Sequence, residues 1–472
     1  MYRLWMCAVL WAALAQPLRA GEFDAVRDLI RGEIQSGAVP SLSVAVARGG
    51  FVVWEEAFGW ADRDGKRPAT PRTMYSLASI SKPFTATALM TLVEAGKVKL
   101  DAPVNDYLDV PLRARIGDAR EATLRRVANH TSGLPLHYQF FYADGPWTRP
   151  PMAETIRRFG NLIAAPGEIY EYSNLGYGVL DYVVERVSGK PYQRYLRENV
   201  LDPLGMKDSA VVVPPGPQGD FAARYETDGR ATPFYDFDHR GGSAVYASVH
   251  DLIRFALFHL KQRQPGQEPI LSAASIDEMQ RPTAPGGYAI GWRNAGGMVS
   301  HTGGMGGVST VLAFVPEKKL AVAVLTNSRS DLPGRVLNAI LNRPSPARPA
   351  SPPGRLFRPA PQLLGEWHGA VETYREKIPL RLVIDRSGAV TAWLAGQPPS
   401  RLTNVSFENG RLVGSGKGDI GIEEANRRPY FLLYSLTARG SRLTGGVSAI
   451  SMPGPRVGNA LTQWVDLARS EP

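Results

Sequence analysis

Three short motifs with the residue types of a serine acyl-transfer site occur in order along the 472-residue chain. They are Ser79-Ile-Ser-Lys82, Tyr172-Ser-Asn174 and His301-Thr302-Gly303-Gly304. A serine hydroxyl is a weak nucleophile at neutral pH, so it needs a base within hydrogen-bonding distance. Because residues i and i+3 share one face of a helix, the spacing places Lys82 beside Ser79. We therefore interpret Ser79 as a nucleophile and Lys82 as its base.

The sequence around Ser79 also indicates how such a base is kept neutral. The pattern predicts a largely apolar helix from Ser79 to Glu94, capped by Ser79 or Ser81. Burial and the positive end of the helix dipole both disfavour an ammonium group at that place. The first turn of a helix also leaves backbone N–H groups unpaired. The N–H of Ser79 can therefore help to hold a developing oxyanion.

The second motif supplies a group for proton transfer. Tyr172 can relay a proton to the leaving group, and a nearby lysine would favour its phenolate, so that the two groups titrate as a pair. Asn174 can orient the lysine or a substrate carbonyl. It can also cap the helix that the apolar stripe predicts over residues 175–187.

The third motif is expected at the end of a strand that lines the site. We interpret His301 and Thr302 as lining groups. Gly303 and Gly304 carry no bulky side chains, so their backbone can receive a substrate as an added edge strand. His130 is interpreted as structural, because Thr-Ser-Gly after it is typical of a turn.

The first twenty residues are typical of a secretory signal. Arg3 provides a positive start, residues 4–14 form an apolar run too short to span a bilayer, and a small residue precedes a cleavage point before Gly21. The one cysteine, Cys7, lies inside this segment, so the mature chain would have no disulfide and no thiolate metal site. We expect an exported protein, periplasmic or secreted, without a transmembrane segment after cleavage.

The remaining chain divides by composition. Residues 21–342 mix amphipathic helices with β-rich runs and hold all three motifs. Residues 343–361 contain seven prolines and predict a semi-extended linker. In residues 362–472 short alternating strands are separated by Gly, Asn, Asp or Ser, which predicts a separate antiparallel β domain, either a sandwich or a small barrel.

Charge and the missing motifs exclude several classes of function. The net charge of +10 becomes +8 without Arg3 and Arg19 (10 − 2), and the excess is dispersed rather than clustered, which argues against a nucleic-acid-binding protein. The histidines lack the paired spacing of a metal site. Neither a Gly-x-Ser-x-Gly elbow nor a complete phosphate-binding loop occurs. We therefore expect no metal and no cofactor.

With these motifs the chain resembles the serine β-lactamase and penicillin-recognising family, in its class C and D-stereospecific aminopeptidase/esterase branch. Further matches are Asn129-His-Thr-Ser-Gly-Leu134, Pro166-Gly167, Gly241-Gly242 and Gly291-Trp292. The resemblance implies an α/β (α+β) fold of the β-lactamase/transpeptidase type, with a five-stranded antiparallel sheet, flanking helices and a helical lobe. It implies Ser79 as nucleophile, Lys82 as base, Tyr172 as acid/base, and the backbone of Ser79 and Gly304 as oxyanion hole. The tail, from Gly365-Glu-Trp367-His-Gly369 onward, resembles the lipocalin-like β-barrels of some members.

One departure from the family pattern concerns the substrate. Class C β-lactamases carry Lys-Thr-Gly at the third motif, where this chain has His301, which is only partly charged at neutral pH. The class A glutamate pattern is also missing, and Glu168 and Glu171 are interpreted as surface or lining groups. The change favours esterase or D-peptidase activity over efficient β-lactam hydrolysis.

Two classes of function follow. The first is an exported serine hydrolase that acts through an acyl-enzyme on an ester, amide, peptide or β-lactam carbonyl. Its substrate would be a small molecule or a peptide, with cell-wall material as a further candidate. The alternative is a non-catalytic ligand-binding or cell-envelope sensor protein on the same scaffold. Loops 136–151 and 212–240, which are rich in aromatic residues, are expected to shape the pocket.

Overall fold

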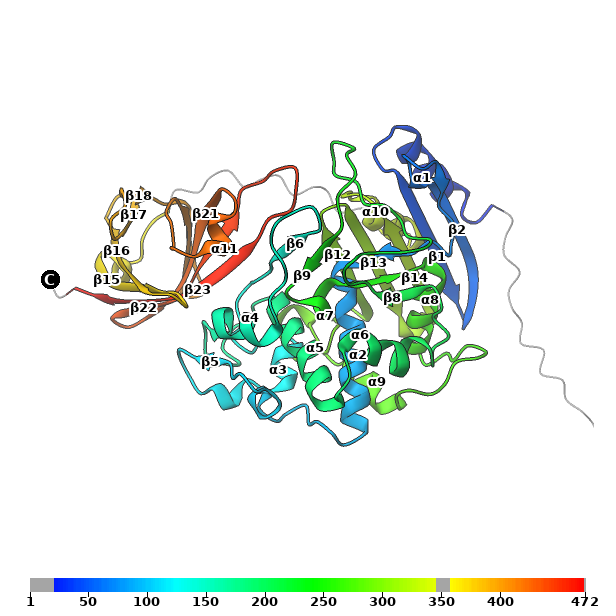
Figure 1. The fold of residues 1–472 in the computed structure, drawn as a ribbon, viewed down its shortest axis with the longest axis horizontal. Helices are drawn as coiled ribbons and strands as arrows, with labels where there is room; N and C mark the ends of the chain where they lie inside the picture. The colour runs from blue at the N-terminus through cyan, green and yellow to red at the C-terminus, as the bar shows by residue number, and fades with distance from the viewer. Residues whose placement is uncertain (1–20, 345–356, 471–472) are drawn as a thin grey trace, which may run out of the picture.

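The computed structural model describes residues 21–344 and 357–470. The predicted signal, 1–20, and most of the predicted linker lie outside the described residues. Among the helices of the described part, none is long and apolar enough to cross a membrane. Two bodies lie side by side, one of mixed helices and strands and one of strands curled into a barrel (Figure 1).

The first body is built on an antiparallel sheet in which five long strands are flanked by two short ones. Its strand order is β11-β12-β13-β14-β1-β2-β3. The strands are β11 (Arg293–Ala295), β12 (Met298–Met305), β13 (Val308–Val315), β14 (Leu320–Thr326), β1 (Ser41–Arg48), β2 (Phe51–Asp62) and β3 (Arg67–Pro68). The expected five-stranded sheet is therefore confirmed and extended by one short strand at each edge.

Both faces of this sheet are covered by helices, because β1 is apolar on both sides. Leu42, Val44 and Val46 face one core, and the alternate Ala45 and Ala47 face another. On the first face lie α1 (Asp24–Gln35) and α10 (Leu332–Ile340). On the second face lies α8 (Val249–His259), and α2 (Ser81–Glu94) packs against α8 through the stacked rings of Phe84 and Phe255. Helix α2 is buried on nearly every side, as its apolar composition predicts.

The helical lobe packs against α2 on the side away from the sheet (Figure 1). Its helices are α3 (Leu124–Ala128), α4 (Met152–Phe159), α5 (Asn174–Ser188), α6 (Tyr192–Leu196), α7 (Arg240–Ser243) and α9 (Ala273–Gln280). Short strands tie its loops together: β4 (Tyr75–Ser76) with β10 (Val245–Ala247) and β8 (Ser209–Val211), β5 (Arg113–Ala114) with β7 (Asn161–Leu162), and β6 (Phe140–Tyr142) with β9 (Tyr235–Phe237).

The second body is a nine-stranded antiparallel sheet that curls into a nearly closed barrel (Figure 1). Its order is β18-β17-β16-β15-β23-β22-β21-β20-β19. The strands are β15 (Gly365–Glu372), β16 (Lys377–Ile384), β17 (Val390–Leu394), β18 (Ser400–Arg401), β19 (Thr403–Glu408), β20 (Arg411–Gly416), β21 (Tyr430–Arg439), β22 (Arg442–Ser451) and β23 (Ala460–Arg469), with the short helix α11 (Glu423–Asn426) before β21.

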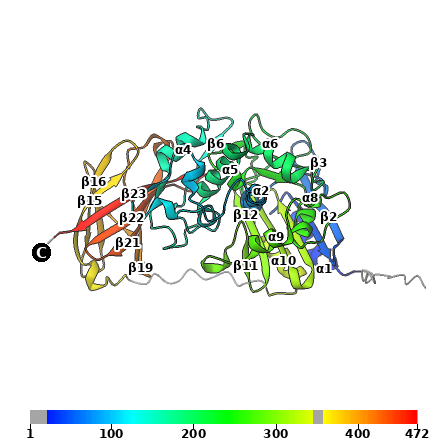
Figure 2. The ribbon, with the colours of Figure 1, turned by 90° about the horizontal axis from the view of Figure 1, so that it is seen from below.

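Alternation along the strands fills the barrel's interior. In β16, Ile378, Leu380, Leu382 and Ile384 are buried, while the residues between them are more exposed. The barrel lies next to α4 in both views, at the end of the first body opposite to α1 (Figure 1, Figure 2). The two bodies are therefore in contact through the helical lobe.

Candidate active site

Ser79 lies in a tight 3₁₀ turn, Ala78–Ile80, immediately before α2. The residue before it, Ala78, has a φ of 48°, in the left-handed region that L-residues rarely adopt. The helix begins at Ser81, and no side chain caps it, so neither Ser79 nor Ser81 serves as the expected cap. Ser81 Oγ instead accepts from the N–H of Val245. The hydroxyl of Ser79 is thereby left for the cavity that it lines.

Lys82 is completely buried, and its amine has three polar neighbours. Its Nζ lies 3.2 Å from Ser79 Oγ, 2.7 Å from Asn174 Oδ1 and 3.1 Å from the carbonyl oxygen of Gly242. Burial lowers the pKa of Lys82 well below its ordinary value. A neutral amine has two N–H groups and one lone pair. Because Asn174 Oδ1 and the Gly242 carbonyl can only accept, they take the two N–H groups and leave the lone pair for the Ser79 hydroxyl.

The Tyr172 ring lies over Lys82, with Nζ 4.8 Å from the ring centroid. Burial raises the pKa of Tyr172, and a hydrogen bond with Ser79 lowers it only in part. The prediction that Tyr172 is a phenolate is therefore wrong: a neutral lysine offers no charge to stabilise a phenolate, and the half-buried phenol keeps its proton. Tyr172 lies ready to donate that proton rather than to accept one.

Asn174 opens α5, but it does not cap the helix. Its neighbour Ser173 does, since Ser173 Oγ accepts from the N–H of Gly176 at 3.1 Å. The amide of Asn174 is thus available to Lys82, which agrees with the orienting role that the sequence suggested and corrects the suggested cap.

His301 lies in the middle of β12, not at the end of a strand as expected. Its Nδ1 is 2.8 Å from the carbonyl oxygen of Thr302, which can only accept, so this nitrogen carries the proton. Nε2 then accepts from the hydroxyl of Tyr288 at 2.8 Å. Burial lowers the pKa of His301 to about 3. The imidazole is therefore neutral at physiological pH, where the sequence suggested partial charge.

Gly303 allows β12 to approach the turn that holds Ser79. A Cβ at this position would lie 2.1 Å from the carbonyl oxygen of Leu77 and 2.2 Å from Thr310 Oγ1, whereas a Cβ at Gly304 would meet nothing within 4 Å. β11 pairs with β12 only as far as Ser300, so the outer edge from His301 onward has no strand partner among the described residues. This free edge faces the cavity.

A cavity of about 530 Å³ joins these groups. Its walls come from the predicted motifs and from a loop that the sequence did not single out; the lining residues are Ser79, Tyr170, Tyr172, Pro285, Gly286, Tyr288, Arg293, Ser300, His301, Thr302 and Gly304. Arg293 is the one charged residue among them, and its Nε donates to the carbonyl oxygen of Gly286 at 2.8 Å. Only the nearby Gly291-Trp292 motif marked this segment in the sequence.

The aromatic residues of loops 136–151 and 212–240 do not line this cavity. Phe140–Tyr142 pairs with Tyr235–Phe237 as β6 and β9, and their rings pack against one another. The expectation that these loops shape the pocket is wrong for the cavity at Ser79, because their aromatic side chains form a small core of their own.

Three further residues near the second motif have structural partners. The ring of His130 lies 4.3 Å from that of Tyr172, and burial lowers the His130 pKa, so the ring is neutral. Glu171 pairs with Arg411 at 2.7 Å, and Glu168 pairs with Arg439 at 2.5 Å. Neither glutamate lines the cavity. Within the described residues no group of three or more His, Cys, Asp or Glu side chains is placed to hold a metal ion.

Comparisons with known proteins identify the family of the chain. The family described as Beta-lactamase matches residues 26–344. Penicillin-binding protein 4* of Bacillus subtilis (strain 168) is 27% identical over 325 residues, which cover 61% of this chain and 68% of that protein. Protein flp of Staphylococcus aureus (strain MW2) is 25% identical, and the match spans 62% of its length.

Two solved structures resemble the fold over nearly the whole chain. The octameric penicillin-binding protein homologue from Pyrococcus abyssi has a TM-score of 0.60 at 24% identity, covering 94% of this chain and 100% of that one. The structure titled SurE with D-Leu has a TM-score of 0.62 at 22% identity, covering 96% and 100%. Because the family match covers more than half of the sequence, the chain belongs to the Beta-lactamase family of serine hydrolases.

Proposed function

We propose that the chain is an exported serine hydrolase that forms an acyl-enzyme on Ser79, with Lys82 as base and Tyr172 as acid. One observation carries the proposal: the buried Lys82 Nζ lies 3.2 Å from Ser79 Oγ, with both of its N–H groups directed to other acceptors. A lone pair held against the hydroxyl is what a general base requires.

The reaction would follow from this arrangement. Lys82 takes the proton of Ser79 as Oγ attacks the carbonyl, and the oxyanion is held by the backbone N–H groups of Ser79 and Gly304. The Tyr172 phenol then gives its proton to the leaving group as the bond to it breaks, and it takes up the proton held by Lys82, which restores both groups. Neutral Lys82 next takes a proton from a water molecule that attacks the acyl-enzyme, and that proton passes to Ser79 Oγ as the acyl bond breaks.

The substrate preference rests on the charges around the cavity. Neutral His301 offers no cation to the carboxylate of a β-lactam, which supports esters and amides of D-amino acids over β-lactams as substrates. Arg293 is the cation that remains at the cavity, so a substrate with a carboxylate on that side would be bound best. A structural neighbour whose title includes D-Leu supports adding D-amino-acid amides to the substrate panel.

Intact-mass spectrometry after incubation with a fluorophosphonate tests the proposal. We expect one adduct on the wild-type chain and none on Ser79→Ala. Untreated wild-type protein would then be assayed against esters, D-amino-acid amides and β-lactams, and Arg293→Met should raise KM for carboxylate-bearing substrates alone. A folded wild-type protein that is never labelled would contradict the proposal and favour a binding function.

Export is the remaining part of the proposal, supported by the charged start, short apolar run and small-residue cleavage point of residues 1–20. Producing the full chain in a bacterium and measuring the mass of the protein outside the cytoplasm tests it. A mature chain that begins at Gly21 is expected, and an uncleaved chain retained in the cytoplasm would contradict it.

A further inference from the structure

The segment that carries Tyr172 is held from two sides, and one of the two sides is the barrel. We call residues 165–173 the tyrosine loop. On its inner side it binds the Asn129–Leu134 segment: the N–H of Gly167 donates to the Thr131 carbonyl at 2.7 Å, and the N–H of Glu171 donates to the His130 carbonyl at 2.9 Å. These bonds come from the same body as Ser79.

On its outer side the tyrosine loop is bound by two arginines of the barrel. Arg411 Nη2 lies 2.7 Å from Glu171 Oε2, and Arg439 Nη2 lies 2.5 Å from the carboxylate of Glu168. The four side chains keep only 21–27% of their surface exposed. Glu171 is bonded directly to Tyr172 in the chain, so the first pair acts one residue away from the phenol.

The two arginines are themselves fixed on the barrel. Arg411 begins β20 and Arg439 ends β21, and these strands are hydrogen-bonded neighbours. The Nε of Arg411 donates to Ser435 Oγ, and the Nε of Arg439 donates to Thr444 Oγ1 at 3.0 Å. Each guanidinium thus binds its own sheet through Nε and the tyrosine loop through Nη2, which limits the rotamer freedom that weakens surface ion pairs.

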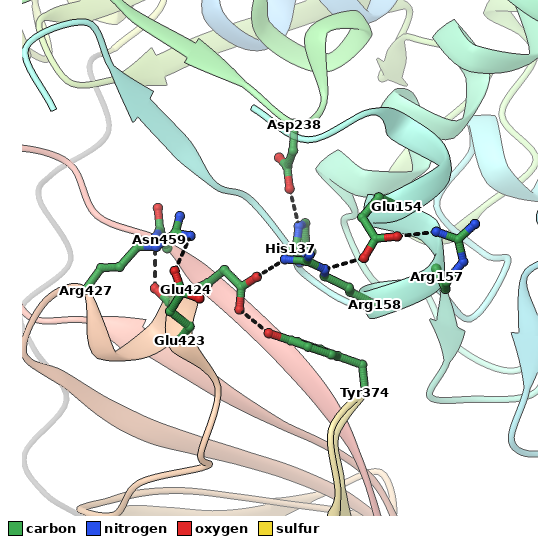
Figure 3. A network of polar contacts seen from close by, with 10 residues as sticks. All are labelled: His137, Glu154, Arg157, Arg158, Asp238, Tyr374, Glu423, Glu424, Arg427 and Asn459. Carbon is green, nitrogen blue, oxygen red and sulfur yellow. Dashed lines mark hydrogen bonds and ion pairs between the residues drawn. The ribbon is translucent and has the colours of Figure 1, made fainter. Parts of the chain in front are cut away.

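The barrel is also docked at a second place, away from Tyr172 (Figure 3). Glu424 of α11 is buried, binds Arg158 of α4, and accepts from the Tyr374 hydroxyl at 2.6 Å. Next to it, the backbone of Tyr138 pairs with that of Ala460 in both directions. Because the barrel is fixed by these contacts, Arg411 and Arg439 present a stationary surface to the tyrosine loop.

We propose that Arg411 and Arg439 are positioning residues for the reaction, so that the barrel forms the outer half of a clamp that sets the place of Tyr172 against Ser79 and Lys82. The inference rests on the proposed function, since it assigns the clamp a role in proton transfer by Tyr172. A loop held on its inner side alone would leave the phenol free to move relative to Ser79, which slows a reaction that depends on its position.

The test measures kcat and KM for a D-amino-acid amide, whose leaving group needs a proton, together with fluorophosphonate labelling, in Arg411→Met/Arg439→Met. We expect kcat to fall roughly tenfold while KM changes by less than about twofold. In a Tyr172→Phe background the same double substitution should change kcat by less than about twofold, because its effect passes through the phenol. Arg411→Lys/Arg439→Lys keeps both charges but loses the Nε contacts with the barrel, so it should restore only part of kcat.

A matched control is the ion pair between Arg456 and Asp144. It also joins the barrel to the first body, at 2.5 Å, but it does not touch the tyrosine loop. Arg456→Met should leave kcat within about twofold of the wild type, at the modest cost in stability of an exposed pair.

The outcomes separate this inference from the proposed function. The clamp alone is overturned if the fluorophosphonate labels the wild type but the double substitution leaves the kcat of the untreated enzyme unchanged. It is also overturned if the double substitution lowers kcat equally in the wild-type and Tyr172→Phe backgrounds. A wild-type chain that is never labelled overturns the proposed function, and the clamp with it.

Discussion

The inner and outer surroundings of Tyr172 are stabilised in different ways. On the inner side Lys82 and His301 are buried and Tyr172 is half-buried, and the loss of contact with water holds all three in their neutral forms. On the outer side Glu168 and Glu171 keep partial exposure and pair with arginines of the barrel. The inner side therefore depends on the exclusion of water, and the outer side on charge pairs that are individually weak. In the proposed reaction, the inner side carries out the chemistry and the outer side only positions Tyr172.

Replacing Lys82, the neutral amine of the inner side, should cause the largest loss of activity. Lys82→Met keeps the buried volume and removes the base, so acylation should fall by roughly 10⁴-fold while the fold remains, because no buried charge is left behind. Stopped-flow acylation by an activated ester measures the loss. Lys97→Met, at an exposed lysine, is the control. A variant of Lys82 that retains most of its rate would show that another group is the base.

A pair of glycine substitutions compares two adjacent positions on β12. Gly303→Ala places a Cβ 2.1 Å from the Leu77 carbonyl and should push β12 away from the turn of Ser79, with a loss of roughly 10³-fold in acylation rate. Gly304→Ala points into open space and should cost less than about tenfold. Equal effects in kinetic assays of the two variants would contradict the close approach as the reason for glycine at 303.

Tyr172→Phe tests whether the proton that burial retains on the phenol is used. The ring would still pack against His130, so the free energy of unfolding should change little. We expect kcat to fall by roughly 10²-fold for amides and by less for activated esters, whose leaving groups do not need a proton. The ratio of the two rates measures this, and an unchanged ratio would exclude the acid role.

The last predicted effect is on stability rather than on rate, and it concerns Asp181, which lies behind the Gly242 carbonyl that binds Lys82. Its Oδ2 accepts from the N–H of Gly241 at 2.5 Å, next to the Gly242 carbonyl that receives Lys82. Burial raises the pKa of Asp181 to about 8, and nearby Arg149 offsets this only in part. A raised folded-state pKa means that the stabilisation is complete below the unfolded pKa of about 4 and is lost as pH rises toward 8.

Asp181→Asn removes that titration. Between pH 5 and pH 8 its free energy of unfolding should improve relative to that of the wild type by about 4 kcal/mol. Denaturant melts at both pH values measure the difference. Parallel pH dependence in the two proteins would show that Asp181 is ionised in the folded state.

Local patterns were sufficient to predict most elements of the first body. The helical spacing of Phe23, Val26, Ile30 and Ile34 predicts α1, the alternation of Leu42, Val44 and Val46 predicts β1, and both lie within two residues of those positions, as does the apolar helix α2. In the barrel, the short β-rich runs at 380–384, 390–394, 431–436 and 443–450 predict β16, β17, β21 and β22. β23 was not, and its pairing with β15 is a contact between residues about a hundred positions apart.

Only the site residues that belong to the three motifs could be predicted from the sequence. Ser79, Lys82, Tyr172 and Asn174 come together as their types and order suggested. Arg293 was not found, because a single arginine in a glycine-rich loop has no pattern of its own. The protonation of His301 and Tyr172 could not be read either, since burial is a property of the assembled fold.

The position of β23 has a consequence for the timing of synthesis. This strand lies between β15 and β22 in the middle of the barrel's sheet, although it is the last of the nine to leave the ribosome. The first body is then complete and can already fold, while the barrel waits for its central strand. A growing chain would therefore hold Ser79 and Lys82 in place before the arginines reach the tyrosine loop, so that full reactivity develops only when translation of the barrel ends.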